Sequence, residues 1–317
     1  MNLVDYAHEG TGFPTWHRQL LLWFEREIQV QTKNHTFRLP YWDWRDPSQR
    51  EILFKKERLG ESVDGVVIGD LFTNWTTSCW EDTKGIEYPI PICNPTISSN
   101  QVLRRCPNPK LCIKENPNWP SASDVNEAIN IEDYDAIAFD RYVNQSKKPS
   151  FRNFMEGFVV KSDGCEEDDT LCTPAKSSSM PAVTRKLHNT VHIILGVGDL
   201  ECSIAFEYQG VMSCVAASPN DPIFINHHAM IDCMLENWIK KNKDILYYPL
   251  CEQIREGHRK YDYIVPFMPL YTHHQMFNTS DNFGYECPDL FSTQATIKAS
   301  TTFVMIVAAV ALIMTVF

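Results

Sequence analysis

Five histidines in two widely separated clusters constrain this chain more than any other feature. His8 and His17 lie near the start, and His188, His192 and His228 lie in the second half. On a helix, His188 and His192 occupy one face about 6 Å apart, so they can bind one ion together. Three neutral imidazoles are typical ligands of copper or zinc. The two clusters therefore predict a site for two metal ions.

Hydrophobic periodicity predicts that most of these histidines lie on helices. Pro14 favours the first turn of a helix, and apolar residues follow it at helical spacing, so His17 lies on an amphipathic helix and His8 in the loop before it. Further helices are predicted over residues 123–130, 182–195 and 222–241. We therefore expect a mainly α fold whose helical-bundle core holds the dinuclear metal site.

Composition favours one globular domain over residues 1–290. The hydrophobic content of 44% is ample for a core, and the net charge of −11 argues against nucleic acid or an anionic membrane surface as a partner. Residues from about 60 to about 135 are rich in Pro, Asn, Ser and Cys, which predicts a long disulfide-stapled connection rather than a second domain.

Cysteines and glycosylation sequons indicate an oxidising, secretory compartment. The chain has 11 cysteines and no Cys-x-x-Cys motif. Close pairs are plausible staples, although sequence leaves the connectivity open: Cys79 with Cys93, Cys106 with Cys112, Cys165 with Cys172, and Cys202 with Cys214. The acceptor asparagines of the sequons are Asn34, Asn74, Asn144 and Asn278.

The C-terminal end of the chain predicts a membrane span, whereas the N-terminal end shows no signal peptide. After a linker over residues 291–300, the apolar run over residues 301–317 predicts a single membrane span with the globular part on the lumenal side. A glycolipid-attachment signal is the alternative for this run. The first seven residues have neither a basic nor an apolar region, so they are not a signal peptide, and we expect the chain to be N-terminally incomplete.

Two longer motifs surround the histidines: one comprises His8, residues 13–18 and Glu25, and the other comprises residues 221–224, His228 and Asp232. They resemble the first and the second copper signature of the tyrosinases, the type-3 copper family of monophenol and diphenol oxidases. Residues 40–46, 150–158 and 265–271 follow in the order expected of vertebrate-type tyrosinases. The resemblance covers the chain up to about residue 290.

The resemblance implies a fold, an activity and a location. It implies two copper ions, dioxygen and a phenolic substrate such as tyrosine or DOPA, with ortho-hydroxylation of monophenols and oxidation of o-diphenols to o-quinones. It also implies a role in melanin synthesis, in the melanosome or a related organelle of the secretory pathway. The family's first ligand of the first copper comes from upstream of the position of His8, and that position would lie before Met1.

Residue roles follow from the same resemblance. The metal ligands are His8, His17, His188, His192 and His228, and Asp232 is a candidate acceptor for the second N–H of a ligating imidazole. Glu156 and Asn189 resemble the pair that holds a water able to take the phenol proton. Phe158 and Phe224 are candidate walls of the substrate pocket. Outside the resemblance, Trp42 and Trp44 are assigned packing roles and His227 is assigned no metal role. Surface roles are favoured for His35, His258, His273 and His274.

Two other functions remain open at this stage. One is a tyrosinase-related zinc protein that acts like a dopachrome tautomerase, although His227-His228-Ala229 is more similar to tyrosinase proper. The other is a catalytically incomplete isoform, because His8 and His17 leave the first copper one ligand short.

Overall fold

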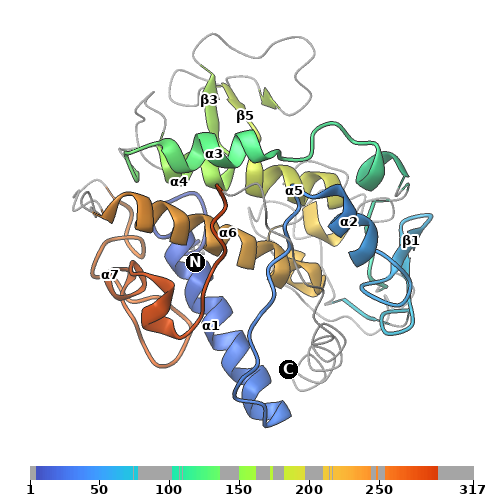
Figure 1. Ribbon diagram of the computed structural model, residues 1–317, viewed down its shortest axis with the longest axis horizontal. Coiled ribbons are helices and arrows are strands. Elements are labelled where there is room, and N and C mark those ends of the chain that lie inside the picture. The colour runs from blue at the N-terminus through green and yellow to red at the C-terminus, as the bar shows by residue number, and fades with distance from the viewer. Residues whose placement is uncertain are drawn as a thin grey trace, which may run out of the picture. The chain divides into compact units, whose positions relative to one another are not determined.

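The protein is mainly helical, as the hydrophobic pattern predicts (Figure 1). The computed structural model describes residues 5–73, 75–77, 102–106, 108, 110–135, 150–161, 172–173, 182–196, 210–213, 215, 217–243, 248 and 254–291. Its helices are α1 (Phe13–Thr32), α2 (Pro47–Leu53), α3 (Ala122–Asn130), α4 (Phe151–Glu156), α5 (Leu187–Gly196), α6 (Ile223–Lys241) and α7 (His273–Met276). Short single turns are η1 (Lys110–Lys114), η2 (Val211–Ser213), η3 (Ser218–Asn220) and η5 (Ser280–Phe283).

Two small antiparallel sheets accompany the helices. One pairs β1 (Glu61–Val63) with β2 (Val66–Ile68), and the other has the order β3-β5-β4, built from β3 (Val159–Lys161), β4 (Cys172–Thr173) and β5 (Ala182–Thr184). The helix predicted over residues 182–195 is therefore wrong at its start. Val183 and Thr184 are β-branched and pair with two neighbouring strands, which outweighs a weak helical pattern.

Helix α1 shows how the sequence sets a helix and its buried face. Pro14 lies in its first turn, and Lys33 in the left-handed region ends it. The buried side chains repeat every three or four residues, so one stripe of the helix faces the core. They include Phe13, His17, Leu21, Phe24 and Ile28.

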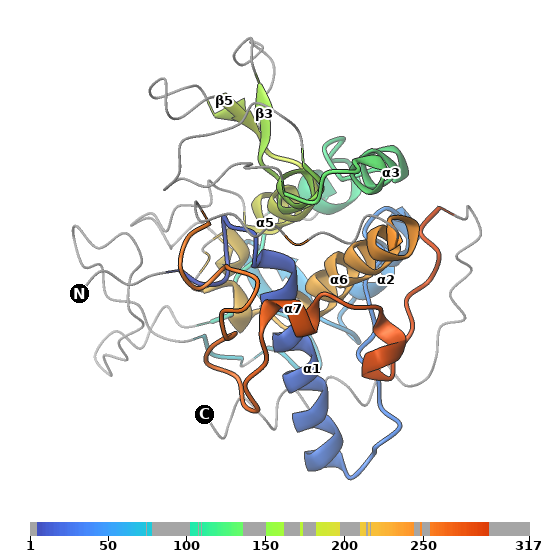
Figure 2. The same ribbon diagram turned by 90° about the vertical axis from the view of Figure 1, so that its left-hand side faces the viewer.

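The chain divides into two compact units, and the division falls within α5 and α6. The first unit comprises Met1–Tyr41, Pro120–Thr190 and His228–Lys298, and the second comprises Trp42–Trp119, Val191–His227 and Ala299–Phe317. In the first unit α1 packs against α4 and α7, and α3 packs against α4 (Figures 1 and 2).

Each unit has an aromatic core. In the first, the rings of Phe151 and Trp238 stack with centroids 5.1 Å apart. In the second, Trp42 packs against Phe54 and Trp119, each at 5.6 Å, and Trp44 is fully buried. The packing roles predicted for Trp42 and Trp44 are thus confirmed.

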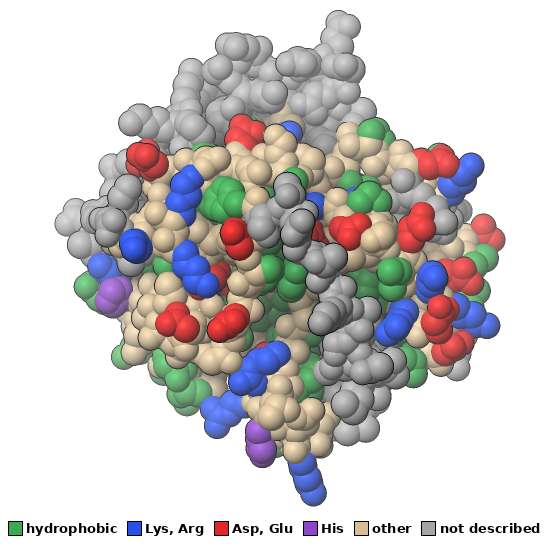
Figure 3. Space-filling model, viewed as in Figure 1, with side chains coloured by type: hydrophobic (Ala, Val, Ile, Leu, Met, Phe, Trp, Pro, Cys, Tyr) green, Lys and Arg blue, Asp and Glu red, His purple; other side chains and the backbone are tan. Residues whose placement is uncertain are grey.

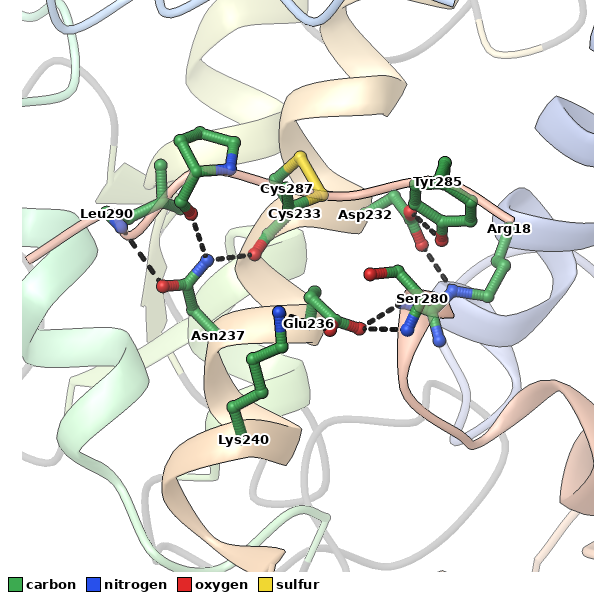
Figure 4. Close-up of a disulfide and its surroundings, with 11 residues drawn as sticks. Arg18, Asp232, Cys233, Glu236, Asn237, Lys240, Ser280, Tyr285, Cys287 and Leu290 are labelled. Atoms are coloured by element: carbon green, nitrogen blue, oxygen red, sulfur yellow. Dashed lines mark hydrogen bonds and ion pairs between the residues drawn. A yellow bond between two sulfur atoms is a disulfide. The ribbon is translucent and has the colours of Figure 1, made fainter. Parts of the chain in front are cut away.

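Two disulfides lie in the described part of the chain. Cys106 pairs with Cys112, which confirms one predicted staple, and Cys233 of α6 pairs with Cys287 (Figure 4), a bond that close spacing in the sequence does not suggest. The other predicted pairs each include a cysteine outside the described residues.

Side chains of both charges lie on the surface. Figure 3 shows acidic and basic side chains interspersed over the face in view rather than gathered by sign.

Of the sequon asparagines, Asn34 is half-buried and Asn278 exposed, whereas Asn74 and Asn144 lie outside the described residues. Among the described helices, none combines the length and apolarity needed to cross a bilayer, and residues 301–317 are not among them.

Candidate metal centre

The first histidine cluster places one imidazole on a loop and one on a helix. His17 is buried on α1, and its Nδ1 lies 2.9 Å from the carbonyl oxygen of Phe13. An N–H donated to that carbonyl leaves Nε2 as the nitrogen that can bind a metal. His8 lies in the loop of residues 5–12, and its Nδ1 is 3.1 Å from the Asp5 carboxylate.

Asp5 is a partner of His8 that the sequence pattern does not reveal. Burial lowers the pKa of His8, but the Asp5 carboxylate together with Glu156 and Glu9 raises it, so the net direction is upward. A carboxylate that accepts the Nδ1–H of an imidazole fixes its ring and makes the other nitrogen a better metal ligand.

The second cluster follows the spacing predicted for it. His188 and His192 lie one turn apart on α5, and both are buried. The Nδ1 of His192 lies 2.7 Å from the carbonyl oxygen of Met212. The Nδ1 of His188 lies 2.9 Å from the side-chain oxygen of Asn189 and 3.2 Å from the backbone oxygen of Glu156. Each Nδ1 is therefore held by an oxygen, which selects Nε2 as the ligand atom.

Imidazoles from both predicted signatures meet in the first unit. The ring of His17 stacks on that of His228 with centroids 4.2 Å apart, and lies 6.3 Å from His188 and 5.1 Å from His8. The rings of His188 and His228 are 4.9 Å apart. Residues distant in the sequence are thus brought within the reach of a common metal centre.

Helices α5 and α6 together present four imidazoles. His188, His192, His227 and His228 each offer one nitrogen, and these nitrogens lie within 4.8 Å of one another. His227, to which the sequence assigns no metal role, is fully buried and contributes to this group.

The donor chemistry fits copper or zinc. The grouped atoms are all imidazole nitrogens of buried rings, and the rings of His188 and His192 are oriented through Nδ1. Calcium and magnesium prefer oxygen ligands, so they match this group poorly.

Glu156 lies at the end of α4 in a network of buried charges. Its carboxylate accepts hydrogen bonds from the backbone N–H of Glu9 at 2.5 Å and from Arg152 at 2.7 Å. Arg152 also pairs with Asp135 at 3.1 Å, and Asp135 accepts from the hydroxyl of Thr11 at 2.7 Å. Burial raises the pKa of Glu156 to about 7, against the opposing effect of Arg152. The network ties α4 to the loop that carries His8.

Gly157 allows Glu156 and Asn189 to approach each other. It caps α4 with a φ of +105°, and a Cβ on it would lie 2.3 Å from the backbone oxygen of Lys186. Only glycine fits both constraints. Asn189 is buried beside Gly157, so the two residues predicted to hold a water lie near each other.

Phe13 is an aromatic residue of the centre that sequence reasoning missed. Its ring lies 4.7 Å from that of His17 and 4.9 Å from that of His188, and it is fully buried. The signal available in the sequence was its position one helical turn before His17. Of the predicted pocket walls, Phe158 is buried under the guanidinium of Arg185, and Phe224 is buried 6.2 Å from the ring of His192.

Asp232 joins α6 to α1 within the first unit. One of its oxygens accepts a hydrogen bond from Arg18 at 2.5 Å, and the other accepts from the hydroxyl of Tyr285 (Figure 4). Arg18 is fully buried, and Glu236 lies 3.6 Å from it. Asp232 thus holds the residue next to His17, and its predicted bond to a ligating imidazole stays a prediction.

The surface roles predicted for His258 and His273 are wrong. Both are fully buried, whereas His35 and His274 are exposed as expected. Polar, loop-like neighbours suggested a surface position, but a neutral imidazole is tolerated inside when its nitrogens are hydrogen-bonded. The Nε2 of His258 lies 3.0 Å from the backbone oxygen of Asp5, and that of His273 lies 2.8 Å from the backbone oxygen of Gly257.

The fold and the site define a mainly helical protein with a histidine-lined metal centre. The family model described as the common central domain of tyrosinase matches residues 1–241. The chain belongs to the tyrosinase family.

Individual relatives agree with this membership. The tyrosinase of Pelophylax lessonae is 32% identical over 287 residues, covering 89% of this chain and 47% of the relative. That of Gallus gallus is 33% identical over 289 residues, covering 89% and 47%. The 5,6-dihydroxyindole-2-carboxylic acid oxidase of Carassius auratus is 29% identical over 320 residues, covering 99% and 54%. The chain therefore spans about half the length of the curated relatives it matches.

Solved structures are also similar to this chain. The tyrosinase from Burkholderia thailandensis at low pH has 14% sequence identity and a TM-score of 0.47, covering 96% of this chain and 64% of that one.

Proposed function

We propose that this chain binds copper in an imidazole-lined dinuclear site and oxidises phenols with dioxygen. The reactions are ortho-hydroxylation of monophenols such as tyrosine and oxidation of o-diphenols to o-quinones, in melanin synthesis. In the overall balance, one monophenol and one dioxygen give one o-quinone and one water. The observation that carries the proposal is the convergence of His17 with His188 and His228.

The histidines divide between two metal positions. His8 and His17 serve the first position, and His188, His192 and His228 serve the second, with His227 as a further donor. Copper supplies the redox chemistry with dioxygen when bound. The oxygens that hold Nδ1 of each anchored ring orient Nε2 before the metal arrives, which reduces the reorganisation that binding requires.

Proton transfer and substrate binding fall to neighbouring residues. Glu156 and Asn189 hold a water that accepts the phenol proton, and Arg152 orients the Glu156 carboxylate through its 2.7 Å bond. Phe158 and Phe224 form walls for the aromatic ring of the substrate. Asp232 supports the ligand helices by binding Arg18.

The deciding experiment measures metal and oxygen together. Elemental mass spectrometry of the full chain after copper loading should find copper, and an oxygen electrode should record uptake with tyrosine and DOPA. His188→Ala should lose the copper of the second position and the oxygen uptake, whereas His274→Ala, which changes an exposed imidazole, should lose neither. Zinc with dopachrome tautomerisation and no oxygen uptake would favour the tautomerase. A chain that retains no metal pair would favour the incomplete isoform.

We also propose a lumenal location in the melanosome, with anchoring through residues 301–317. The vertebrate tyrosinases among the relatives support the location, and the sequons support a glycosylated chain. Removal of N-linked glycans should raise the electrophoretic mobility of the chain isolated from pigment cells, and an unchanged mobility would contradict glycosylation.

A further inference from the structure

Two imidazoles outside the group of candidate ligands lie behind the loop that carries His8. His258 and His273 are fully buried, and their rings stack with centroids 6.3 Å apart and 6° between the planes. They form a stacked histidine pair whose nitrogens bind polypeptide groups rather than facing a metal position.

His258 bridges the two ends of the loop of residues 5–12. Its Nδ1 accepts a hydrogen bond from the backbone N–H of Gly12 at 3.1 Å, and its Nε2 lies 3.0 Å from the backbone oxygen of Asp5. Three residues away, Arg255 donates to the backbone oxygen of His8 at 2.7 Å. A single ring thus fixes the loop at its first and last residues, with His8 between them.

His273 supports the start of the helix that carries His17. Its Nδ1 lies 2.6 Å from the hydroxyl of Thr15, in the first turn of α1, and its Nε2 lies 2.8 Å from the backbone oxygen of Gly257. Because Nε2 donates to a carbonyl, Nδ1 is the acceptor of the Thr15 hydroxyl proton.

The loop backbone touches both rings, and this contact needs glycine. A Cβ on Gly12 would lie 2.4 Å from the ring of His273, and one on Gly10 would lie 2.7 Å from the ring of His258. Distances this short leave no room for a methyl group between the loop and the stacked pair. The lack of a side chain at Gly10 and Gly12 therefore allows the loop backbone to contact the two buried rings.

We propose that His258 and His273 are positioning residues for the first metal position, acting through the loop of residues 5–12 and the first turn of α1. The pair fixes the backbone on both sides of His8, and it also holds the first turn of the helix that carries His17. The metal part of this inference rests on the proposed function, whereas the contact between the pair and the loop can be tested without metal.

Hydrogen exchange of the metal-free full chain tests the contact directly. In His258→Leu, amides between residues 5 and 15 should exchange about tenfold faster, because the ring's two hydrogen bonds to the loop are lost. Peptides from α3 (Ala122–Asn130) should be unchanged. His258→Gln keeps one acceptor and one donor and should restore most of the protection, and His274→Leu serves as the exposed control.

Copper binding gives the second readout. His258→Leu should bind copper at the first position at least about tenfold more weakly, with binding by the α5 and α6 histidines retained. Unchanged exchange in residues 5–15, or equally faster exchange there and in α3, would overturn the proposal. If His258→Leu does not fold, Gly12→Ala decides, since it keeps both rings but displaces the loop, and normal exchange in that variant would also overturn it. A wild-type chain that binds no copper rejects the proposed function and leaves the exchange result valid.

Discussion

The two halves of the metal centre hold their imidazoles by different means. His188 and His192 lie on one face of α5 because of their spacing, and short bonds from Nδ1 complete their orientation. His8 lies on a loop and depends on Asp5 beside it and on Arg255 and His258 from the far end of the chain. A helix positions a ligand through local geometry, whereas a loop needs distant side chains. The loop half should therefore be the more sensitive to substitutions remote from the metal.

The largest expected effect comes from removing a ligand of the helical half. Loss of a residue that only hydrogen-bonds to a metal ligand typically reduces activity by about 10–100-fold. His228→Ala removes a ligand itself, so it should reduce phenol oxidation by more than that. Helix α6 should persist, because its buried apolar face is unchanged. Copper content and far-ultraviolet circular dichroism of the same sample check both statements. A variant with normal copper content would remove His228 from the ligand set.

A comparably large effect on stability is expected from the charges behind the loop half. Arg152→Leu leaves the buried carboxylates of Asp135 and Glu156 without their cation, which should lower the free energy of unfolding by about 3–5 kcal/mol. Urea denaturation measures this change. Lys110→Leu, which removes an exposed pair with Glu115, should change it by less than about 1 kcal/mol. Equal effects of the two substitutions would argue against a buried network.

A smaller effect isolates the support of His8. Asp5→Asn replaces the carboxylate beside Nδ1 by a neutral amide of the same size. Copper affinity at the first position should fall by about 10–100-fold, while binding by the α5 and α6 histidines is unchanged. Competition titration with a copper chelator separates the two. An equal loss at both positions would contradict the division into a loop half and a helical half.

Just below neutral pH, the smallest effect is a dependence of stability on pH. Burial lowers the pKa of His258 to about 3 and that of His273 to about 4, although Asp5 and Asp262 oppose this and Arg255 adds to it at His258. In the unfolded chain both pKa values are near 6.5, so that state binds more protons at lower pH. The two neutral histidines therefore contribute fully to the free energy of unfolding above about pH 6.5. This contribution falls as the pH drops from there toward about 4, by up to about 1.4 kcal/mol per pH unit for each histidine.

Urea unfolding of the metal-free chain at several pH values measures this slope. Substitution of both histidines by glutamine should reduce the slope of stability against pH, because glutamine does not titrate. A slope in the double variant equal to that of the wild type would assign the acid sensitivity to other groups.

Local patterns predicted a large part of the helical scaffold. The predicted starts of α1 and α6 and the whole of α3 lie within about two residues of the observed bounds, because Pro14, Pro222 and a capping serine mark them. The pattern failed at β5, where pairing with β3 and β4 decides the conformation. It also failed at His258 and His273, because burial of a polar side chain depends on partners far away in the sequence.

The sequence by itself determined the family, the helical spacing of His188 and His192, and the residue types that suit copper, since these follow from local order and donor chemistry. Tertiary structure decided which side chains surround them. The meeting of His17 with His228, the Asp5 carboxylate beside His8, the Arg152 network and the Cys233–Cys287 disulfide all join distant segments. Side-chain spacing carries information over one or two turns of helix, whereas these contacts exist only after the chain has folded.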